Sequence, residues 1–511
     1  MQVHRTIHTW KSAWSVRVVA LVITLALAVA ACDSDSSGGP AATFEPEACP
    51  TSVASLPALA NARCGALVVP ENRTKHNGRT IRLAVAIIPS VSQPLAPDPV
   101  VHMTGGPGGD ALTEAQFLVP AGLNQHRDLI IMAQRGTLDT EPELTCPEID
   151  RFNAQAIGLP YDADATKRLH LAATQACHDR LVAQGIDLSA YNTTENAADF
   201  ADLRKVLGIA EWNVYGTSYG TYLALSLMRD HPEGIRSVII DSVQPPSVAT
   251  LGWTWTNLHE AFNNTFSACD AQPACRQKYG DLASTFASLV QQYEAHPLTT
   301  TAEGPQGGPP VTVVLDGGHL VNWLAGAPRP LTKIPSAIEE LVQGHPTQIA
   351  AARAALTDPA LVGIFGHGLT YSVLCRELIP FEPASAILTQ GRLAFPTYPD
   401  SVLAQAPQLP FETEDCAIWN VPPAPSSVRQ VTRSTIPTLV IAGSFDAKTS
   451  PQWAVYAAQT LPHSTTIVIP GIGHWVTPQS PCAQSVIASF LATPSAPDTS
   501  CVATLSPPPF D

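Results

Sequence analysis

The sequence predicts an α/β fold with a mostly parallel central sheet and an inserted, mainly helical cap. Three features indicate it: short apolar runs alternate with helical patterns, a glycine-flanked serine follows one such run, and the alternation stops at 245–435 before apolar runs return. Parallel strands need crossover connections, which helices usually supply, so the alternation favours a sheet covered on both faces. With 511 residues the chain is long enough for such a core and a large insertion.

Each expected strand is a short run of apolar or β-branched residues bounded by turn formers. These runs lie at 66–70, 81–88, 99–103, 128–133, 212–215, 237–241, 437–443 and 465–470. A helix is expected over 195–207, with Thr194 as its N-cap. Inside the insertion, 261–290 and 334–356 have helical periodicity, whereas 303–310 is rich in glycine and proline and is expected to be a loop.

The N-terminus has the features of an export signal. Three basic residues, Arg5, Lys11 and Arg17, precede an apolar segment at 18–31 that is too short for a membrane span. Small residues directly before Cys32 resemble a lipobox, which predicts cleavage there and a lipid on the cysteine sulfur; ordinary secretion is the alternative. We therefore expect a protein that is exported and either lipid-anchored at the bacterial cell membrane or envelope, or secreted.

The chain is expected to divide into a lipoprotein signal peptide and five further parts of different character. These are the signal at 1–31, a flexible tether at 32–48, a first core part at 49–244, the helical cap at 245–435, a C-terminal core part at 436–502 and a tail at 503–511. The formal net charge of −15 and the lack of a basic run after the signal argue against nucleic-acid binding. We expect a monomer that meets the membrane only through its N-terminal lipid.

The cysteines favour disulfides. Of 11 cysteines, Cys32 is assigned to lipidation, and the even number that remains in an exported chain points to disulfide pairs. No Cys-x-x-Cys spacing occurs, which argues against zinc or redox chemistry. Spacing does not fix the connectivity, but pairing in sequence order gives Cys49–Cys64, Cys146–Cys177, Cys269–Cys275, Cys375–Cys416 and Cys482–Cys501.

The pattern Gly-x-Ser-x-Gly at 216–220 stands between an expected strand and a helical pattern. In that setting the serine is a candidate nucleophile, because the sharp turn lifts its hydroxyl above the sheet. Gly216 and Gly220 allow the close packing of backbone that such a turn requires. Ser218 would lie beside the N-terminus of the next helix, where developing negative charge is favoured.

An oxyanion site should come from the amide after the nucleophile and from the loop after the third strand. The first amide belongs to Tyr219. The loop at 104–109 is glycine-rich, and its amides can point at a carbonyl oxygen without obstruction by a side chain. We expect Gly106 to supply the second donor, with Gly105 as the next candidate; a plain flexible turn is the alternative interpretation.

A serine nucleophile needs a base, and the base needs an orienting acid. His474 follows the last expected strand in a glycine-rich loop, and we expect it to be the base. Asp446 follows the strand at 437–443 and is the expected acid. Asp241, at the end of the strand after the serine, is the rival, either as the acid or as a structural partner of the turn.

Five segments together resemble the secreted tripeptidyl aminopeptidase-like (TAP-like) α/β-hydrolases, relatives of prolyl aminopeptidases: 105–108, 134–137, 216–220, Asp446 and 471–474. The likeness extends over roughly 49–501 of the sequence. It implies an α/β-hydrolase fold, Ser218 as nucleophile with Asp446 and His474, and release of short peptides from a free N-terminus. We expect Arg135 to hold its loop through an ion pair.

An aminopeptidase of this kind must bind an ammonium group, so carboxylates are expected near the serine. Glu377, Glu414 and Asp415 are the candidates, because they stand beside Cys375 and Cys416, whose pairing would bring them together. Acidic residues on a solvated cap surface are the alternative interpretation for each.

The sequence thus predicts a serine hydrolase that acts on peptides through an acyl-enzyme, without a metal or organic cofactor. A carboxylesterase or lipase with the same triad is the first alternative, because fold and triad do not fix the substrate. A surface lipoprotein that keeps the fold for binding alone is the second. The expected partner is a peptide or a small ester.

Overall fold

The computed structural model describes residues 41–511 except 76–77, 249, 327–328 and 408–409. The expected signal peptide, Cys32 and most of the expected tether lie outside the described residues. The described residues form one compact unit. None of its described helices is both long and apolar enough to cross a membrane.

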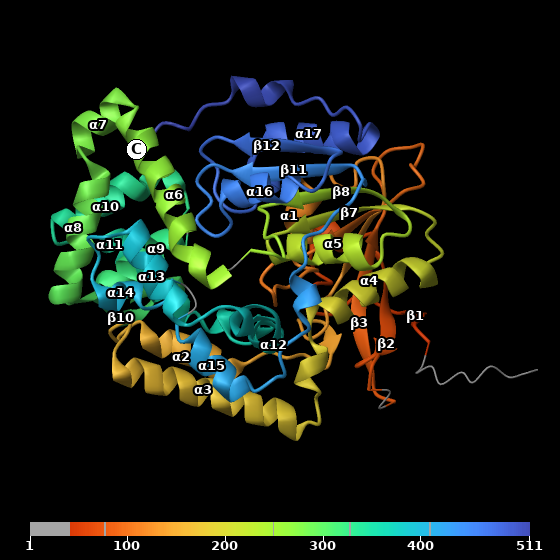
Figure 1. Cartoon of the computed structure of the whole chain (residues 1–511), viewed down its shortest axis with the longest axis horizontal. Helices are drawn as coiled ribbons and strands as arrows, with labels where there is room; N and C mark the ends of the chain where they lie inside the picture. Colours follow the sequence, from red (N-terminus) through yellow and green to blue (C-terminus); the bar gives the residue numbers. More distant parts are fainter. Residues whose placement is uncertain (1–40, 76–77, 249, 327–328, 408–409) are drawn as a thin grey trace, which may run out of the picture. The chain divides into compact units, whose positions relative to one another are not determined.

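A ten-stranded sheet lies at the centre of this unit (Figure 1), in the order β1-β2-β3-β5-β4-β7-β8-β11-β12, with β6 beside β3. The strands are β1 (Thr43–Pro46), β2 (Arg63–Pro70), β3 (Thr80–Ile88), β4 (Val100–Met103), β5 (Leu129–Met132), β6 (Thr140–Glu141), β7 (Trp212–Thr217), β8 (Ile235–Asp241), β11 (Thr438–Gly443) and β12 (Ser464–Ile469). From β5 to β12 neighbouring strands are parallel, whereas β1, β2 and β3 pair antiparallel. Each expected strand is present with ends shifted by a few residues, and the α/β-hydrolase fold class is confirmed.

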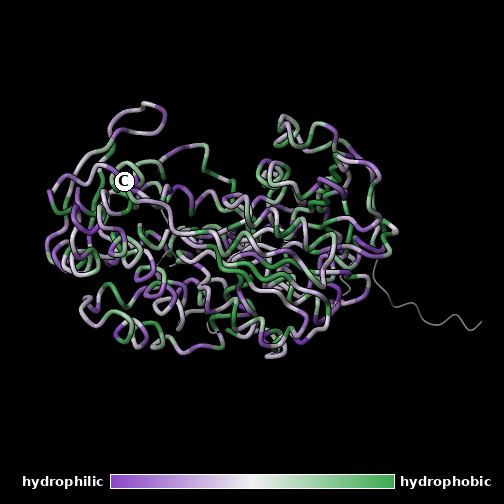
Figure 2. Tube along the Cα trace, turned by 90° about the horizontal axis from the view of Figure 1, so that it is seen from above, coloured by the Kyte–Doolittle hydropathy of each residue, from purple (hydrophilic) through white to green (hydrophobic). Residues whose placement is uncertain are grey.

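Helices cover both faces of the sheet because its strands are apolar on both sides. On β7, Trp212 and Val214 join the larger hydrophobic core, whereas Tyr215 joins the smaller one on the other face. The larger core includes α4 (Thr193–Val206), α5 (Tyr219–Asp230) and α16 (Pro451–Ala458); the smaller includes α1 (Ala115–Leu118) and α17 (Pro481–Ala492). Figure 2 shows hydrophobic residues concentrated in the strands that cross the middle of the view.

Helix α4 begins earlier than expected, and the prediction of Thr194 as its N-cap is wrong. The N-cap is Asn192, whose side chain accepts a hydrogen bond from the Glu195 amide at 3.0 Å. An asparagine three residues before a glutamate is a known signal for a helix start, so the sequence carried the evidence.

The region inserted between β8 and β11 is mainly helical. Its helices are α6 (Thr250–Asp270), α7 (Pro273–Tyr279), α8 (Leu282–Ala295), α9 (Gly317–Ala325), α10 (Ile334–Val342), α11 (Thr347–Ala354), α12 (His367–Val373), α13 (Ser385–Ala394), α14 (Asp400–Leu403) and α15 (Glu412–Trp419). It also contains a hairpin of β9 (Leu298–Gly304) and β10 (Gly308–Leu315). The expectation of a loop over 303–310 is therefore wrong, since the glycines form the hairpin turn and the flanking threonines and valines form its strands.

Two helices from the first half of the chain pack with this insertion. They are α2 (Pro147–Ala156) and α3 (Asp164–Ala183), and α3 lies alongside α15 (Figure 1). The cap therefore draws on two separate segments, and only one of them is the insertion expected from the sequence.

The described residues contain five disulfides. They join Cys49–Cys64, Cys146–Cys177, Cys269–Cys275, Cys375–Cys416 and Cys482–Cys501, which are the pairs expected from sequential pairing. One of them joins the start of α2 to α3, and another ties the segment after α12 to α15. The cap is thus cross-linked at the places where its short helices meet.

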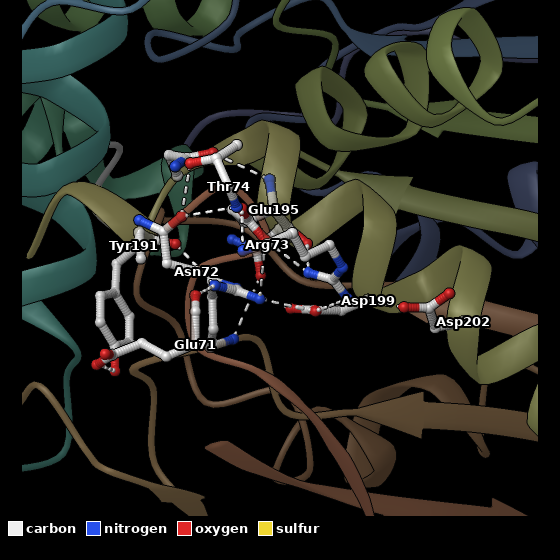
Figure 3. Close-up of polar contacts among 12 residues, drawn as sticks. Glu71, Asn72, Arg73, Thr74, Tyr191, Glu195, Asp199 and Asp202 are labelled. Carbon is white, nitrogen blue, oxygen red and sulfur yellow. Dashed lines mark hydrogen bonds and ion pairs between the residues drawn. The ribbon is translucent and has the colours of Figure 1, made fainter. Parts of the chain in front are cut away.

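A buried ionic cluster fixes the loop after β5 against α4. The Arg135 guanidinium donates to both oxygens of Asp199 at 2.8 Å and to the backbone carbonyls of Glu71 and Ala190. Arg73 reaches the same helix and pairs with carboxylates of α4, including Asp199 (Figure 3). The expected ion pair of Arg135 is confirmed, and its role is to hold one wall of the fold.

Candidate active site

Ser218 occupies a strained turn between β7 and α5. Its backbone has φ 54° and ψ −124°, a conformation that a residue with a side chain adopts only when its surroundings impose it. The flanking glycines show why: a Cβ on Gly216 would lie 2.4 Å from the Gly220 carbonyl oxygen, and one on Gly220 would lie 2.0 Å from that of Met103. The Ser218 amide donates to the Asp241 carbonyl at 3.0 Å, which ties the turn to β8.

His474 and Asp446 face each other beyond the ends of β12 and β11. The His474 Nδ1 atom lies 2.9 Å from Asp446 Oδ2 and 3.0 Å from Oδ1. Asp446 is fully buried, which would by itself raise the pKa of its carboxyl group. The charge and hydrogen bond of His474, with hydrogen bonds from Thr449, outweigh burial and hold that pKa below its ordinary value.

Thr449 is a member of this arrangement that the sequence analysis missed. Its hydroxyl donates to Asp446 Oδ2 at 2.8 Å and lies 3.2 Å from His474 Nδ1. The amides of Lys448 and Thr449 both donate to Asp446 Oδ1, as in an Asx turn. The spacing Asp-x-x-Thr after an apolar strand was the available signal.

Asp241, the rival acid, holds the backbone next to His474 instead of its ring. One carboxylate oxygen accepts from the Val476 amide at 3.0 Å, and the other accepts from the amide and hydroxyl of Thr477 at 2.8 and 2.6 Å. Tyr215 and Ser242 hydroxyls also donate to it. Asp241 is thus a structural partner of the loop that carries the histidine.

The glycine-rich loop after β4 lies directly against the serine. A Cβ on Gly105 would be 2.8 Å from Ser218 Cβ and 3.4 Å from its Oγ. Gly106 has φ +115°, a conformation that favours glycine, and a Cβ there would meet the Gly108 amide nitrogen at 2.6 Å. Both predicted donors of this loop, together with Tyr219, line one cavity with Ser218.

Buried polar groups behind this loop fix its position. Glu114 accepts from the Thr104 hydroxyl at 2.6 Å, and its other oxygen lies 2.5 Å from His102 Nε2. The Gln134 side-chain amide donates to the Thr104 carbonyl at 2.9 Å. These side chains come from β4, from the segments that follow β4 and β5, and from the N-cap of α1, so several elements of the core together fix the loop.

A cavity of about 530 Å³ joins Ser218 and His474 between the core and the cap. Its walls from the core include the glycine-rich loop, Tyr222 and Lys448, and its cap walls include Leu258, Thr370 and several aliphatic side chains. A cavity of this size with an apolar wall and a few polar groups suits a small organic ligand.

The cap forms direct hydrogen bonds with the glycine-rich loop. The Thr370 hydroxyl donates to the Pro107 carbonyl at 2.6 Å, and the Gly366 amide donates to the Gly108 carbonyl at 2.8 Å. A Cβ on Gly108 would lie 2.7 Å from the Gly366 carbonyl oxygen. Helix α12 therefore fixes the loop that is expected to hold the oxyanion.

The three carboxylates expected to bind substrate do not line this cavity. Asp415 accepts from His170 and Thr174, and Glu414 pairs with Lys167, so both fasten α15 to α3. Glu377 is buried, accepts from the Thr193 amide at 2.7 Å and lines a separate cavity. Burial raises the pKa of Glu377, against opposing hydrogen bonds from Thr193.

The fold and this arrangement of serine, histidine and glycine loop define the class of protein: an α/β-hydrolase. The family described as "alpha/beta hydrolase fold" matches residues 98–325, and the one described as "TAP-like protein" matches 405–502. The chain therefore has the α/β-hydrolase fold, is similar to TAP-like proteins in its C-terminal part, and is a hydrolase.

The sequences of several named proteins align with most of this chain. A tripeptidyl aminopeptidase of Streptomyces coelicolor is 25% identical, with 88% of this chain and 84% of the relative covered. The serine protease Hip1 of Mycobacterium tuberculosis is 22% identical, with 84% and 85% covered. Among solved structures, proline iminopeptidase of Mycobacterium smegmatis is 15% identical over 84% of this chain and 98% of its own, with a TM-score of 0.36.

Proposed function

We propose that this chain is an exported serine peptidase that releases short peptides from the free N-terminus of its substrates. The observation that carries the proposal is the 2.9 Å contact of His474 with buried Asp446, together with a cavity that both His474 and Ser218 line. The relatives named as a tripeptidyl aminopeptidase and a serine protease support a peptide as the substrate. The disulfides support export, since such bonds persist in oxidising compartments.

In the proposed reaction, His474 Nε2 takes the proton of Ser218 as its Oγ attacks the peptide carbonyl carbon. Asp446 keeps the Nδ1 proton of the imidazole in place and stabilises the imidazolium that forms. The amides of Tyr219 and Gly106 receive the negative charge of the tetrahedral oxygen. His474 then protonates the departing amine, and water enters by the same route to release the acyl group.

Recognition of a free N-terminus requires an acceptor for an ammonium group. Glu114 is the one carboxylate among the described residues that line the cavity. Its oxygens already accept from Thr104 and contact His102, and its side chain is 18% exposed, so it retains a face toward the cavity. We therefore place Glu114, in preference to Glu377, Glu414 and Asp415, as the group that meets the ammonium.

Two measurements test the proposal. A fluorophosphonate probe should label the wild-type protein and not Ser218→Ala, because it reacts with an activated serine. Ala-Pro-Ala-anilide should be hydrolysed, and its N-acetylated form should be a much poorer substrate because acetylation removes the cation. Equal cleavage of the blocked and free peptides would refute the exopeptidase assignment.

An esterase is the second candidate, and one observation favours it. The cavity wall from the cap is aliphatic at Leu258, Val373, Leu374 and Leu378, which suits an acyl chain as well as a peptide. A butyrate ester hydrolysed far faster than the anilide would support this candidate. The predicted lipid at Cys32 is tested separately by mass spectrometry of the mature N-terminus.

A further inference from the structure

We propose that Lys448 recognises a carboxylate of the substrate and so determines specificity in the cavity beside Ser218. The inference rests on the proposed function, because it takes this cavity to be where the substrate binds. It adds the chemical class of the substrate: a molecule with a negative charge close to the bond that is cleaved.

The first argument is the set of charged side chains that line the cavity. These are Glu114, His367, Lys448 and His474. Three of them are engaged by other groups: Glu114 by Thr104 and His102, His367 by a carboxylate at 2.8 Å, and His474 by its aspartate. Within the part of the chain that the structure describes, the Lys448 ammonium has no hydrogen-bond or ion-pair partner.

The second argument is how Lys448 is placed. Its amide donates to Asp446 Oδ1 at 2.8 Å, so the backbone from which the side chain starts is fixed by the same turn that orients His474. The Asp446 carboxylate is fully covered and already accepts from the histidine and Thr449, so it offers the ammonium no direct pair. The lysine side chain is accessible and lines the cavity, free to meet a ligand.

The third argument is electrostatic. The Lys448 side chain is exposed, although neighbouring protein atoms lower the pKa of its ammonium by partial desolvation, and the nearby Asp446 carboxylate opposes this effect. Because the ammonium lines the cavity, a carboxylate bound there would be screened less by water than one on an open surface. An incoming carboxylate would form a charge-assisted hydrogen bond with the Lys448 ammonium.

A second cation lies on the same side of the histidine. The Arg329 guanidinium donates to the His474 carbonyl at 2.8 Å, and its charge contributes to lowering the pKa of Lys448. Two cations at this side stand out in a chain whose formal net charge is −15. Their field would attract an anionic group and disfavour a cationic one at this position.

A carboxylate near the cleaved bond can come from two sources. It can be the C-terminus of a short peptide, or the side chain of an aspartate or glutamate in a longer one. Both meet an ammonium by the same charge-assisted hydrogen bond. Two matched peptide pairs separate them: Ala-Pro-Ala-Ala with a free or amidated C-terminus, and Ala-Pro-Ala-Asp-amide against Ala-Pro-Ala-Asn-amide.

Binding is measured by calorimetry on Ser218→Ala, so that the result does not depend on turnover. In this background one pair should show about tenfold tighter binding of the charged member, since a charged hydrogen bond in a partly screened site is worth about one decade. Adding Lys448→Met should remove that preference, and Lys448→Arg should retain most of it. Lys205→Met, which removes a lysine from the exposed end of α4, is the matched control and should leave the preference unchanged.

The pair that shows the preference identifies the source of the carboxylate. A preference that persists in Lys448→Met, or its absence from both pairs in Ser218→Ala alone, would overturn the inference. Hydrolysis of Ala-Pro-Ala-anilide, which has no carboxylate, by the wild-type protein tests the proposed function independently. A protein that binds the charged peptide through Lys448 but hydrolyses no peptide would retain the inference and lose the peptidase assignment.

Discussion

Substitution of Asp446 by asparagine should abolish nearly all activity while the protein stays folded. In the wild type, one oxygen of Asp446 accepts from the backbone amides of Lys448 and Thr449, and the other faces the Thr449 hydroxyl and His474. Asparagine can keep its oxygen toward the two amides. Its NH2 group then faces His474 Nδ1, which must become an acceptor.

The rate loss follows from the tautomer. When Nδ1 accepts, the proton of a neutral imidazole lies on Nε2, and that nitrogen can no longer take the proton of Ser218. A substitution of this kind lowers kcat by about 10⁴ in a serine protease. The free energy of unfolding should fall by only about 1–2 kcal/mol, because asparagine can replace each hydrogen bond of Asp446 except the charged one with His474.

Asp241→Asn is the matched control and should behave in the opposite way. Backbone amides approach both of its oxygens, from Val476 on one side and Thr477 on the other. Whichever way an asparagine turns, its NH2 group meets an N–H donor, which leaves buried donors unpaired. This should cost about 2–4 kcal/mol of unfolding free energy, with a smaller effect on kcat in the protein that remains folded.

The assay is urea unfolding of both variants, paired with kcat on Ala-Pro-Ala-anilide under conditions where each variant is folded. Far-ultraviolet circular dichroism checks the fold before each rate is measured. A result in which Asp241→Asn loses activity by 10⁴ at unchanged stability, while Asp446→Asn remains active, would refute the assignment of the acid.

Three further predictions concern the loop, the cap and a buried acid. Gly105→Ala should lower kcat/KM by about 100-fold or more without unfolding the protein, since the new Cβ would lie 2.8 Å from Ser218 Cβ. Steady-state kinetics on the anilide measures this loss, and a variant as active as the wild type would contradict the placement of the loop. Replacing Cys375 and Cys416 by serine should cost about 4 kcal/mol, since the bond closes a loop of sequence separation 41; calorimetric Tm values compare the two proteins. Burial raises the pKa of Glu412, so the folded state is favoured while this acid is protonated, and the free energy of unfolding falls as pH rises through the folded pKa. Glu412→Gln should therefore raise Tm more at pH 8 than at pH 4. An equal shift in Tm at both pH values would contradict this prediction.

The core and the centre of its site could be predicted because their signals are local. A buried parallel strand is a continuous apolar run, and a loop at its end follows directly in the sequence. Ser218, Asp446 and His474 all stand just after such runs, and parallel strands bring their carboxyl ends to one edge. Tertiary contacts therefore added little that the order of the strands did not already imply.

The cap could not be predicted in the same way because its contacts are between distant short helices. Glu414 and Asp415 stand beside a disulfide, as expected, but their partners Lys167 and His170 come from a helix that the sequence analysis did not assign to the cap. The sequence alone does not distinguish a carboxylate that pairs with a residue of another helix from one that is free to bind a ligand. Only the packing of α3 on α15 distinguishes them.

The two aspartates illustrate why residue type and strand position alone were insufficient. Asp241 is still within the sheet, in register with Ile441 of β11, whereas Asp446 lies beyond the end of that strand. The carboxylate inside the sheet edge binds the amides of Val476 and Thr477 and three nearby hydroxyls, whereas the one beyond the edge contacts the imidazole. The loop of His474 is consequently held twice: Asp446 contacts the imidazole ring and sets its tautomer, and Asp241 holds the amides that follow it.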